Sequence, residues 1–119
     1  MLNEVRVFIA EDEPFIALDL VAAVEDAQGT VIGPAGSIRE ALTILQCTQP
    51  HVGLLDAHLS DGEVTPIAEL LVNRGVPILF YCGHGLTPDL KTRHPRTSVF
   101  IKPQPHIVIV HEIAALMHR

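Results

Sequence analysis

The sequence is poor in the residues that mark several classes of protein. Its 119 residues include two cysteines, one tyrosine and no tryptophan. Two cysteines, Cys47 and Cys82, imply no disulfide framework and fit a reducing compartment such as the cytosol. So few aromatic side chains leave little material for a surface that stacks on nucleic-acid bases or encloses a flavin.

Basic residues and long apolar runs are also scarce. Eight Lys and Arg stand against 14 Asp and Glu, which gives a formal charge of −6. A general nucleic-acid binder needs a basic face to neutralise phosphates, so we expect no direct contact with nucleic acid. The apolar runs are far shorter than the roughly 18 residues of a membrane helix, and the start, MLNEVRV, has no apolar signal-peptide region. We therefore expect a cytoplasmic protein with no membrane segment.

What the sequence does contain is enough apolar material for a packed core and a regular alternation of segments. With 48% apolar residues, we expect residues 1–119 to form one domain. Five short apolar segments predict buried strands: VRVFIA (5–10), TVIG (30–33), VGLLDA (52–57), VPILFYC (76–82) and SVFI (98–101).

Segments with helical spacing of apolar residues lie between these strands. The first begins at Pro14, the second follows the capping box formed by Ser37 and Glu40, and the third begins at Val64. The last covers residues 106–119. Residues 83–97 contain two glycines and two prolines, so any helix there should be short or loose. The (βα)5 order predicts an α/β fold, a doubly wound parallel five-stranded sheet with helices on both faces.

Polar side chains stand where the predicted strands end. Glu11 and Asp12 follow the first strand, Asp56 ends the third, Cys82 ends the fourth and Lys102 follows the fifth. If the strand order is 2-1-3-4-5, all of them meet at one edge of the sheet. Three converging carboxylates repel one another, and a divalent cation with hard oxygen ligands, such as Mg²⁺, relieves that repulsion. The ammonium of Lys102 could pair with a carboxylate or a phosphoryl oxygen.

Three motifs in this order resemble those of response-regulator receiver domains of two-component signalling. They are VFIAEDE (7–13), GLLDAHLSDGE (53–63) and IKP (101–103). Each is weak alone, but their order and spacing are specific, and the resemblance covers essentially the whole chain. It implies a single-domain, chemotaxis-receiver-like protein with the flavodoxin-like strand order 2-1-3-4-5, an order known from a chemotaxis receiver. It also implies a cis peptide bond between Lys102 and Pro103.

The resemblance assigns roles to individual residues. Asp56 would accept the phosphoryl group, and Lys102 would hold one of its oxygens. Glu11, Asp12 and Asp56 would bind Mg²⁺, and the backbone carbonyl of His58 would complete the site. A histidine kinase or phosphotransfer protein would supply the phosphoryl group, and a downstream protein would respond to it. Such a domain catalyses its own phosphorylation and dephosphorylation and is not a conventional turnover enzyme.

Two positions depart from the family pattern. The family usually has Thr or Ser where Cys82 stands, and a thiol is a weaker hydrogen-bond donor than a hydroxyl. It usually has Tyr or Phe where Val99 stands, although Phe100 is adjacent. We therefore expect the family's activation switch, which couples this hydroxyl to the aromatic ring, to be absent. Residues 83–97, with few expected buried contacts, are instead predicted to reorder on phosphorylation.

Plainer interpretations stand beside these roles. Glu11 and Asp12 could cap a helix, and Asp56 could be a turn residue at the end of its strand. We expect Glu13 to be solvated, Cys47 and Cys82 to be packing residues, and Asp61 with Gly62 to form a turn. His58 and His84 would flank the path of a hydrolytic water or would simply be exposed. The basic residues Lys91, Arg93 and Arg96 would form a solvated face.

Two other functions remain open from the sequence. One is a degenerate receiver that binds partners without a phosphorylation cycle, which Cys82 and Val99 favour and the retained acids oppose. The other is a small flavodoxin-like cofactor protein. No Ser-, Thr- or Gly-rich phosphate cradle follows the first strand, and the acids there would repel a phosphate, so this second alternative is disfavoured.

Overall fold

The five apolar segments form the strands of one parallel sheet in the computed structural model, which describes residues 1–118. These strands are β1 (Arg6–Ala10), β2 (Thr30–Ala35), β3 (Val52–Leu55), β6 (Ile78–Cys82) and β7 (Val99–Ile101). Their order in the sheet is β2-β1-β3-β6-β7, and every neighbouring pair is parallel. The predicted order 2-1-3-4-5 is therefore confirmed.

Several strand boundaries differ from the prediction: the first and fifth strands start one residue later, the second ends at Ala35 and not at residue 33, and two others differ for a clear physical reason. The third strand ends at Leu55 and not at residue 57, because the chain turns there into a short antiparallel hairpin, β4 (His58–Leu59) with β5 (Gly62–Glu63). The fourth strand starts at Ile78 and not at residue 76, because Pro77 has no backbone N–H to donate to the sheet. The sequence patterns gave no sign of the hairpin.

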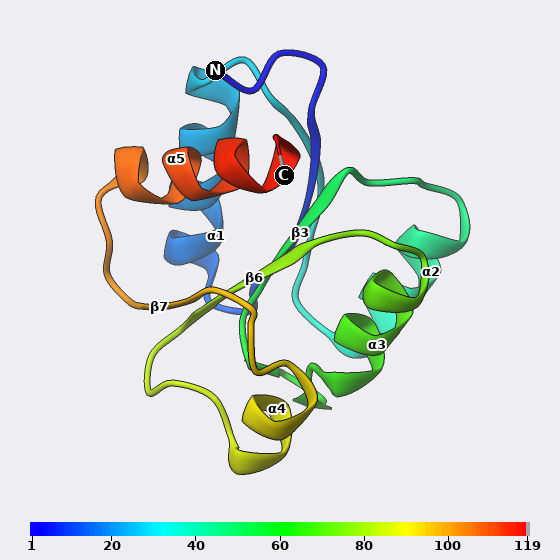
Figure 1. The fold of residues 1–119 in the computed structure, drawn as a ribbon. Helices are drawn as coiled ribbons and strands as arrows, with labels where there is room; N and C mark the ends of the chain where they lie inside the picture. Colours follow the sequence, from blue (N-terminus) through cyan, green and yellow to red (C-terminus); the bar gives the residue numbers. More distant parts are fainter. Residues whose placement is uncertain (119) are drawn as a thin grey trace.

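Helices cover both faces of the sheet (Figure 1). They are α1 (Pro14–Asp26), α2 (Ile38–Gln46), α3 (Thr65–Asn73), α4 (Pro88–Arg93) and α5 (His106–Met117). Buried residues of α1 and α5 form one apolar cluster with the sheet, and those of α2, α3 and α4 form the other. Because strand side chains alternate between faces, neighbouring Phe80 and Tyr81 belong to opposite clusters. Residue 119, the end of the last predicted helix, lies outside the described residues.

The segment 83–97 is better anchored than its composition suggested. Its helix is short, as expected, at six residues. However, Leu86, Leu90 and His94 are all buried, and Arg93 forms ion pairs with Asp89 and Glu69. The expectation of few buried contacts is therefore wrong for 86–97 and holds only for Gly83–Gly85 at the start, where no side chain is buried.

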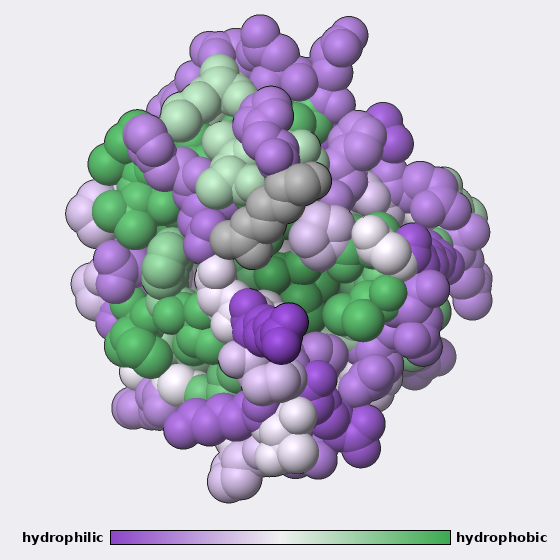
Figure 2. All heavy atoms as spheres, in the orientation of Figure 1, coloured by the Kyte–Doolittle hydropathy of each residue, from purple (hydrophilic) through white to green (hydrophobic). Residues whose placement is uncertain are grey.

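The surface is not uniformly polar. Phe15 and Leu18 on α1 are 79% and 65% exposed, and Ile107 on α5 is 57% exposed. Figure 2 shows apolar atoms reaching the surface between polar ones in this view. Residues three apart on a helix are neighbours on its surface, so Phe15 and Leu18 form one exposed apolar pair. Among residues 1–118, no helix combines the length and apolar character that crossing a membrane requires.

Candidate functional site

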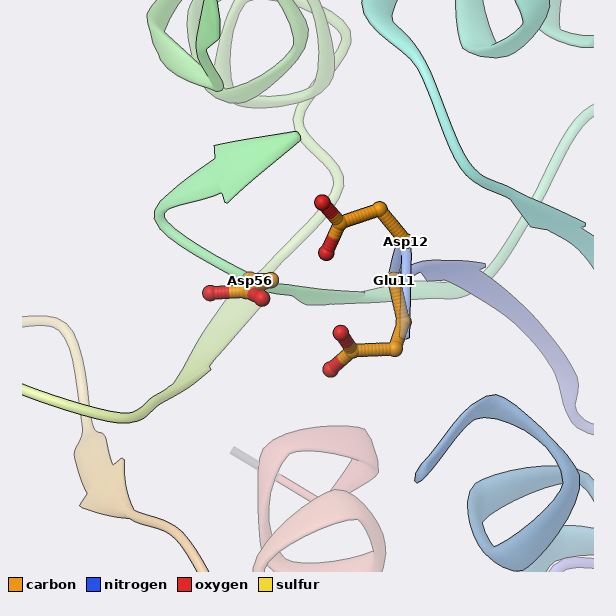
Figure 3. Close-up of side chains that lie close together, drawn as sticks. All are labelled: Glu11, Asp12 and Asp56. Carbon is orange, nitrogen blue, oxygen red and sulfur yellow. The ribbon is translucent and has the colours of Figure 1, made fainter. Parts of the chain in front are cut away.

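Three carboxylates converge at the carboxyl edge of the sheet (Figure 3). Glu11 and Asp12 follow β1, and Asp56 follows β3; one oxygen from each lies within 4.8 Å of the others. The backbone holds them there, because Glu11 N donates to Ala35 O and Asp56 N donates to Ala10 O, both at 2.9 Å. These bonds continue the pairing of the sheet beyond the strand ends and fix where the two side chains start.

Lys102, which follows the edge strand β7, reaches across β6 to the carboxylates. Its ammonium lies 2.7 Å from Glu11 Oε1 and 2.9 Å from Asp56 Oδ2. The side chains of Glu11, Asp56 and Lys102 are 1%, 12% and 13% exposed, so this group is largely shielded from water. The sequence-based prediction that Lys102 pairs with a carboxylate at this edge is confirmed, and the Lys102–Pro103 bond is cis as expected.

Burial and charge set the protonation of this group. Burial raises the pKa of Glu11 to about 7, although the hydrogen bond from Lys102 opposes that rise. Burial alone would lower the pKa of Lys102, but the hydrogen bonds and charges of Glu11 and Asp56 outweigh it and raise that pKa. Lys102 therefore stays an ammonium. An ionised Glu11, by contrast, makes the folded state less stable.

The donor set fits a hard divalent cation. Three carboxylate oxygens at this separation match the oxygen ligands that Mg²⁺ prefers, and Asp12 is exposed to solvent, so water can complete the coordination. Beside them opens a cavity of about 350 Å³. It is lined by Asp12, Asp56, Ala57, His58, Cys82, Gly83, His84, Gly85 and Lys102. The predicted site residues thus share one cavity, apart from Glu11 behind it; a role for the His58 carbonyl stays a prediction.

The two atypical positions have distinct surroundings. Cys82 is buried and lines the cavity, and burial raises the pKa of its thiol, so the sulfur carries its proton. Val99 is partly buried against the cluster of α2, α3 and α4, while Phe100 packs on the opposite face. Phe100 therefore does not stand in for the aromatic residue that Val99 lacks.

Two single residues, Glu13 and Cys47, have surroundings that differ from the expectation. Glu13 is not merely solvated: its carboxylate accepts the N–H of Ile16 at 2.8 Å and caps α1. Glu11 also accepts a backbone N–H here, that of Glu13 at 3.1 Å, through its Oε2, while its Oε1 faces Lys102. Cys47, expected to pack, is exposed at the end of α2.

The loop after Asp56 is tied to the start of α2, which the sequence did not indicate. Asp61 accepts the N–H groups of Ile38 at 2.7 Å and Arg39 at 3.2 Å. Ser60 N donates to Gly36 O at 3.2 Å. The Asp-Gly pair predicted a turn, but the distant helix that Asp61 caps could not be identified without the fold. We name this set of bonds the Asp61 clamp.

No protein-family model matches the chain, but known proteins resemble it in sequence and in fold. Over 78 residues the chain is 39% identical to the phyllosphere-induced regulator PhyR of Methylorubrum extorquens, a match that covers 63% of this chain and 29% of that protein. The chain thus spans a third or less of the curated relatives it matches.

Two solved structures cover nearly the whole chain. The solution structure of SdrG from Sphingomonas melonis is 30% identical with a TM-score of 0.81, and the match covers 95% of this chain and 96% of that one. The receiver (REC) domain of the response regulator PhyR from Erythrobacter litoralis has a TM-score of 0.81 at 21% identity, covering 98% and 92%, and it supports the fold alone.

The fold and the acidic edge define a flavodoxin-like α/β domain of the receiver type. This chain belongs to the receiver domains of response regulators.

Proposed function

We propose that this domain accepts a phosphoryl group on Asp56 and signals through protein contacts in a two-component phosphorelay. The observation that carries the proposal is the convergence of three carboxylates beside an open cavity, two of them paired with one ammonium. Asp56 is the acid that both contacts Lys102 and lines the cavity, so it is the carboxylate that an incoming phosphoryl group can reach.

The chemistry follows from the side chains. A carboxylate oxygen of Asp56 attacks the phosphorus, the bond from phosphorus to the donor breaks, and an aspartyl phosphate results. The ammonium of Lys102, already 2.9 Å from Asp56, pairs with one of the new phosphoryl oxygens. Water later attacks the phosphorus, inorganic phosphate leaves, and the carboxylate is restored. Positioning and charge stabilisation account for most of the catalysis in such transfers.

Glu11, Asp12 and Asp56 would hold Mg²⁺, with the backbone carbonyl of His58 as a further ligand. The bound cation supplies positive charge beside the phosphoryl oxygens. Glu11 is buried and Asp12 is exposed, so Glu11 would bind the cation from the protein interior and Asp12 from the solvent side.

The partners follow from the location of the site. A histidine kinase or phosphotransfer protein in the cytoplasm would present its phosphoryl group at the cavity. Helix α1 begins just after the acids, so a donor protein that reaches Asp56 would also meet the exposed pair Phe15 and Leu18. A downstream protein would then respond to the phosphorylated form.

Intact-mass analysis with acetyl phosphate tests the assignment. We expect one Mg²⁺-dependent phosphoryl adduct in the wild type and in the matched control Asp19→Asn, which changes an exposed carboxylate outside the cluster. Asp56→Asn should give none. An adduct that persists in Asp56→Asn, or one that forms equally in EDTA, would contradict the proposal.

A second candidate is a degenerate receiver that binds its partner without phosphorylation. The buried thiol of Cys82 favours it, because a thiol is a poor donor to a phosphoryl oxygen. Partner binding that is equally tight for the wild type and Asp56→Asn, with and without phosphodonor, would favour this candidate over the first.

A further inference from the structure

The segment that carries Lys102 has few backbone hydrogen-bond donors. Residues 102–105 connect β7 with α5, and two of the four, Pro103 and Pro105, have no backbone N–H. Lys102 and Gln104 therefore provide the only backbone donors of this segment. Their partners decide how firmly the ammonium of Lys102 is held.

Both donors bind neighbouring residues at the end of β6. Lys102 N donates to the backbone oxygen of Cys82 at 2.9 Å, as a continuation of the sheet. Gln104 N donates to the phenolic oxygen of Tyr81, also at 2.9 Å. The second bond depends on one side chain, so a phenylalanine at this position would leave Gln104 N without that partner.

The ring of Tyr81 also faces the charged end of Lys102. The ammonium lies 5.9 Å from the ring centroid, which is within the range of a cation–π contact. Tyr81 is 5% exposed, so the ring is fixed by packing. Tyr81 thus contacts both the backbone that carries Lys102 and the ammonium itself.

We propose that Tyr81 is a positioning residue that holds Lys102 beside Asp56. The ring attracts the ammonium, and the hydroxyl fixes the segment behind it. The positioning role of Tyr81 does not depend on the proposed function, but its effect on phosphorylation does. With the segment fixed, Lys102 can turn from Asp56 to a phosphoryl oxygen by side-chain rotation alone.

The first arm of the test needs no phosphorylation. The chain has two lysines, Lys91 and Lys102, so lysine-selective ¹³C labelling gives two Cε–Hε signals. Lys91 is exposed on α4 and serves as the internal reference. The ring should shift the Lys102 signal away from that of Lys91. Tyr81→Phe, which keeps the ring, should retain most of this shift, and Tyr81→Leu should abolish it.

Phe100→Leu is the matched control. Phe100 pairs with Tyr81 across the sheet and packs in the same apolar cluster, so this change removes a ring without removing the contact to Lys102. Coincident Lys91 and Lys102 signals in the wild type, or equal changes in Phe100→Leu and Tyr81→Leu, would overturn the proposal.

The second arm measures phosphorylation from acetyl phosphate and Mg²⁺. Loss of one neutral hydrogen bond corresponds to a roughly two- to tenfold effect on a rate. Tyr81→Phe should therefore form the adduct more slowly by that factor, with little change in melting temperature. A wild-type rate in Tyr81→Phe would overturn the role of the hydroxyl. If the wild type forms no adduct while the lysine signals behave as expected, the proposed function fails and the positioning role of Tyr81 stands.

Discussion

Replacing Glu11 with glutamine should stabilise the metal-free protein, in a manner that depends on pH. Glu11 is 3% exposed, and burial raises its pKa from 4.5 to about 7 even though Lys102 is 2.7 Å away. At about 1.4 kcal/mol for each pH unit between these values, ionised Glu11 disfavours the folded state by roughly 3 kcal/mol.

The sign follows from proton linkage. An acid whose pKa is raised on folding favours the folded state while it is protonated, and this contribution is lost as pH rises from 4.5 through about 7. Glutamine does not titrate. Glu11→Gln and the wild type should therefore be about equally stable near pH 4.5, and the variant should be more stable by roughly 3 kcal/mol at pH 8.

Urea unfolding in EDTA at a series of pH values measures this difference. With a slope of about 2 kcal/mol per molar urea, the midpoint of Glu11→Gln should exceed that of the wild type by roughly 1.5 M at pH 8. Glu25→Gln, on the exposed side of α1, is the matched control, because it removes a carboxylate that has no part in the cluster. Addition of Mg²⁺ should raise the stability of the wild type more than that of Glu11→Gln.

Two outcomes would refute the reasoning. A difference between Glu11→Gln and the wild type that is the same at every pH would show that burial does not disfavour the charge. A variant that is less stable throughout would show that the pair with Lys102 more than compensates burial. The expected result would instead mean that the protein keeps a destabilising acid, which fits selection for cation binding and not for stability.

Three further outcomes are expected. Cys82→Thr should increase the response to beryllium fluoride severalfold, because a hydroxyl is the better donor and one neutral hydrogen bond contributes about 1 kcal/mol; equal NMR responses would argue against this. His58 and His84, both exposed and lining the cavity, should alter the aspartyl-phosphate lifetime when replaced by alanine, and lifetimes unchanged in both variants would exclude them. Hydrogen exchange with and without beryllium fluoride should change most at 83–85, the unanchored part of the segment predicted to reorder; a change confined to 56–62 would contradict this.

The sequence was sufficient for the sheet and for the acidic cluster. Buried parallel strands appear as short apolar runs, and polar residues at their carboxyl ends must meet at one edge. Glu11, Asp12, Asp56 and Lys102 could be picked out from their places after the strands, given the strand order that the family resemblance supplied, and the structure brings them together.

What the sequence could not supply are contacts between elements that are distant along the chain. Asp61 caps α2 from 22 and 23 residues away, and no local pattern encodes such a partner. His94 belongs to no motif in the sequence, yet it is buried with its ring 5.8 Å from that of Phe80. Tyr81 looked like one more residue of an apolar strand, and its bond to Gln104 depends on the path of the chain after β7.

The Asp61 clamp makes the two walls of the cavity mechanically unequal. The wall after Asp56 is stiff, because Asp61 and Ser60 are bonded to the start of α2. The facing wall, Gly83–Gly85, has open space beside it, since a Cβ atom added at Gly83 would meet nothing within 4 Å, and we expect it to yield more easily. We therefore expect any group bulkier than a carboxylate on Asp56 to displace the wall at Gly83–Gly85 first. The strain it creates would travel toward α4, while α2 keeps its place.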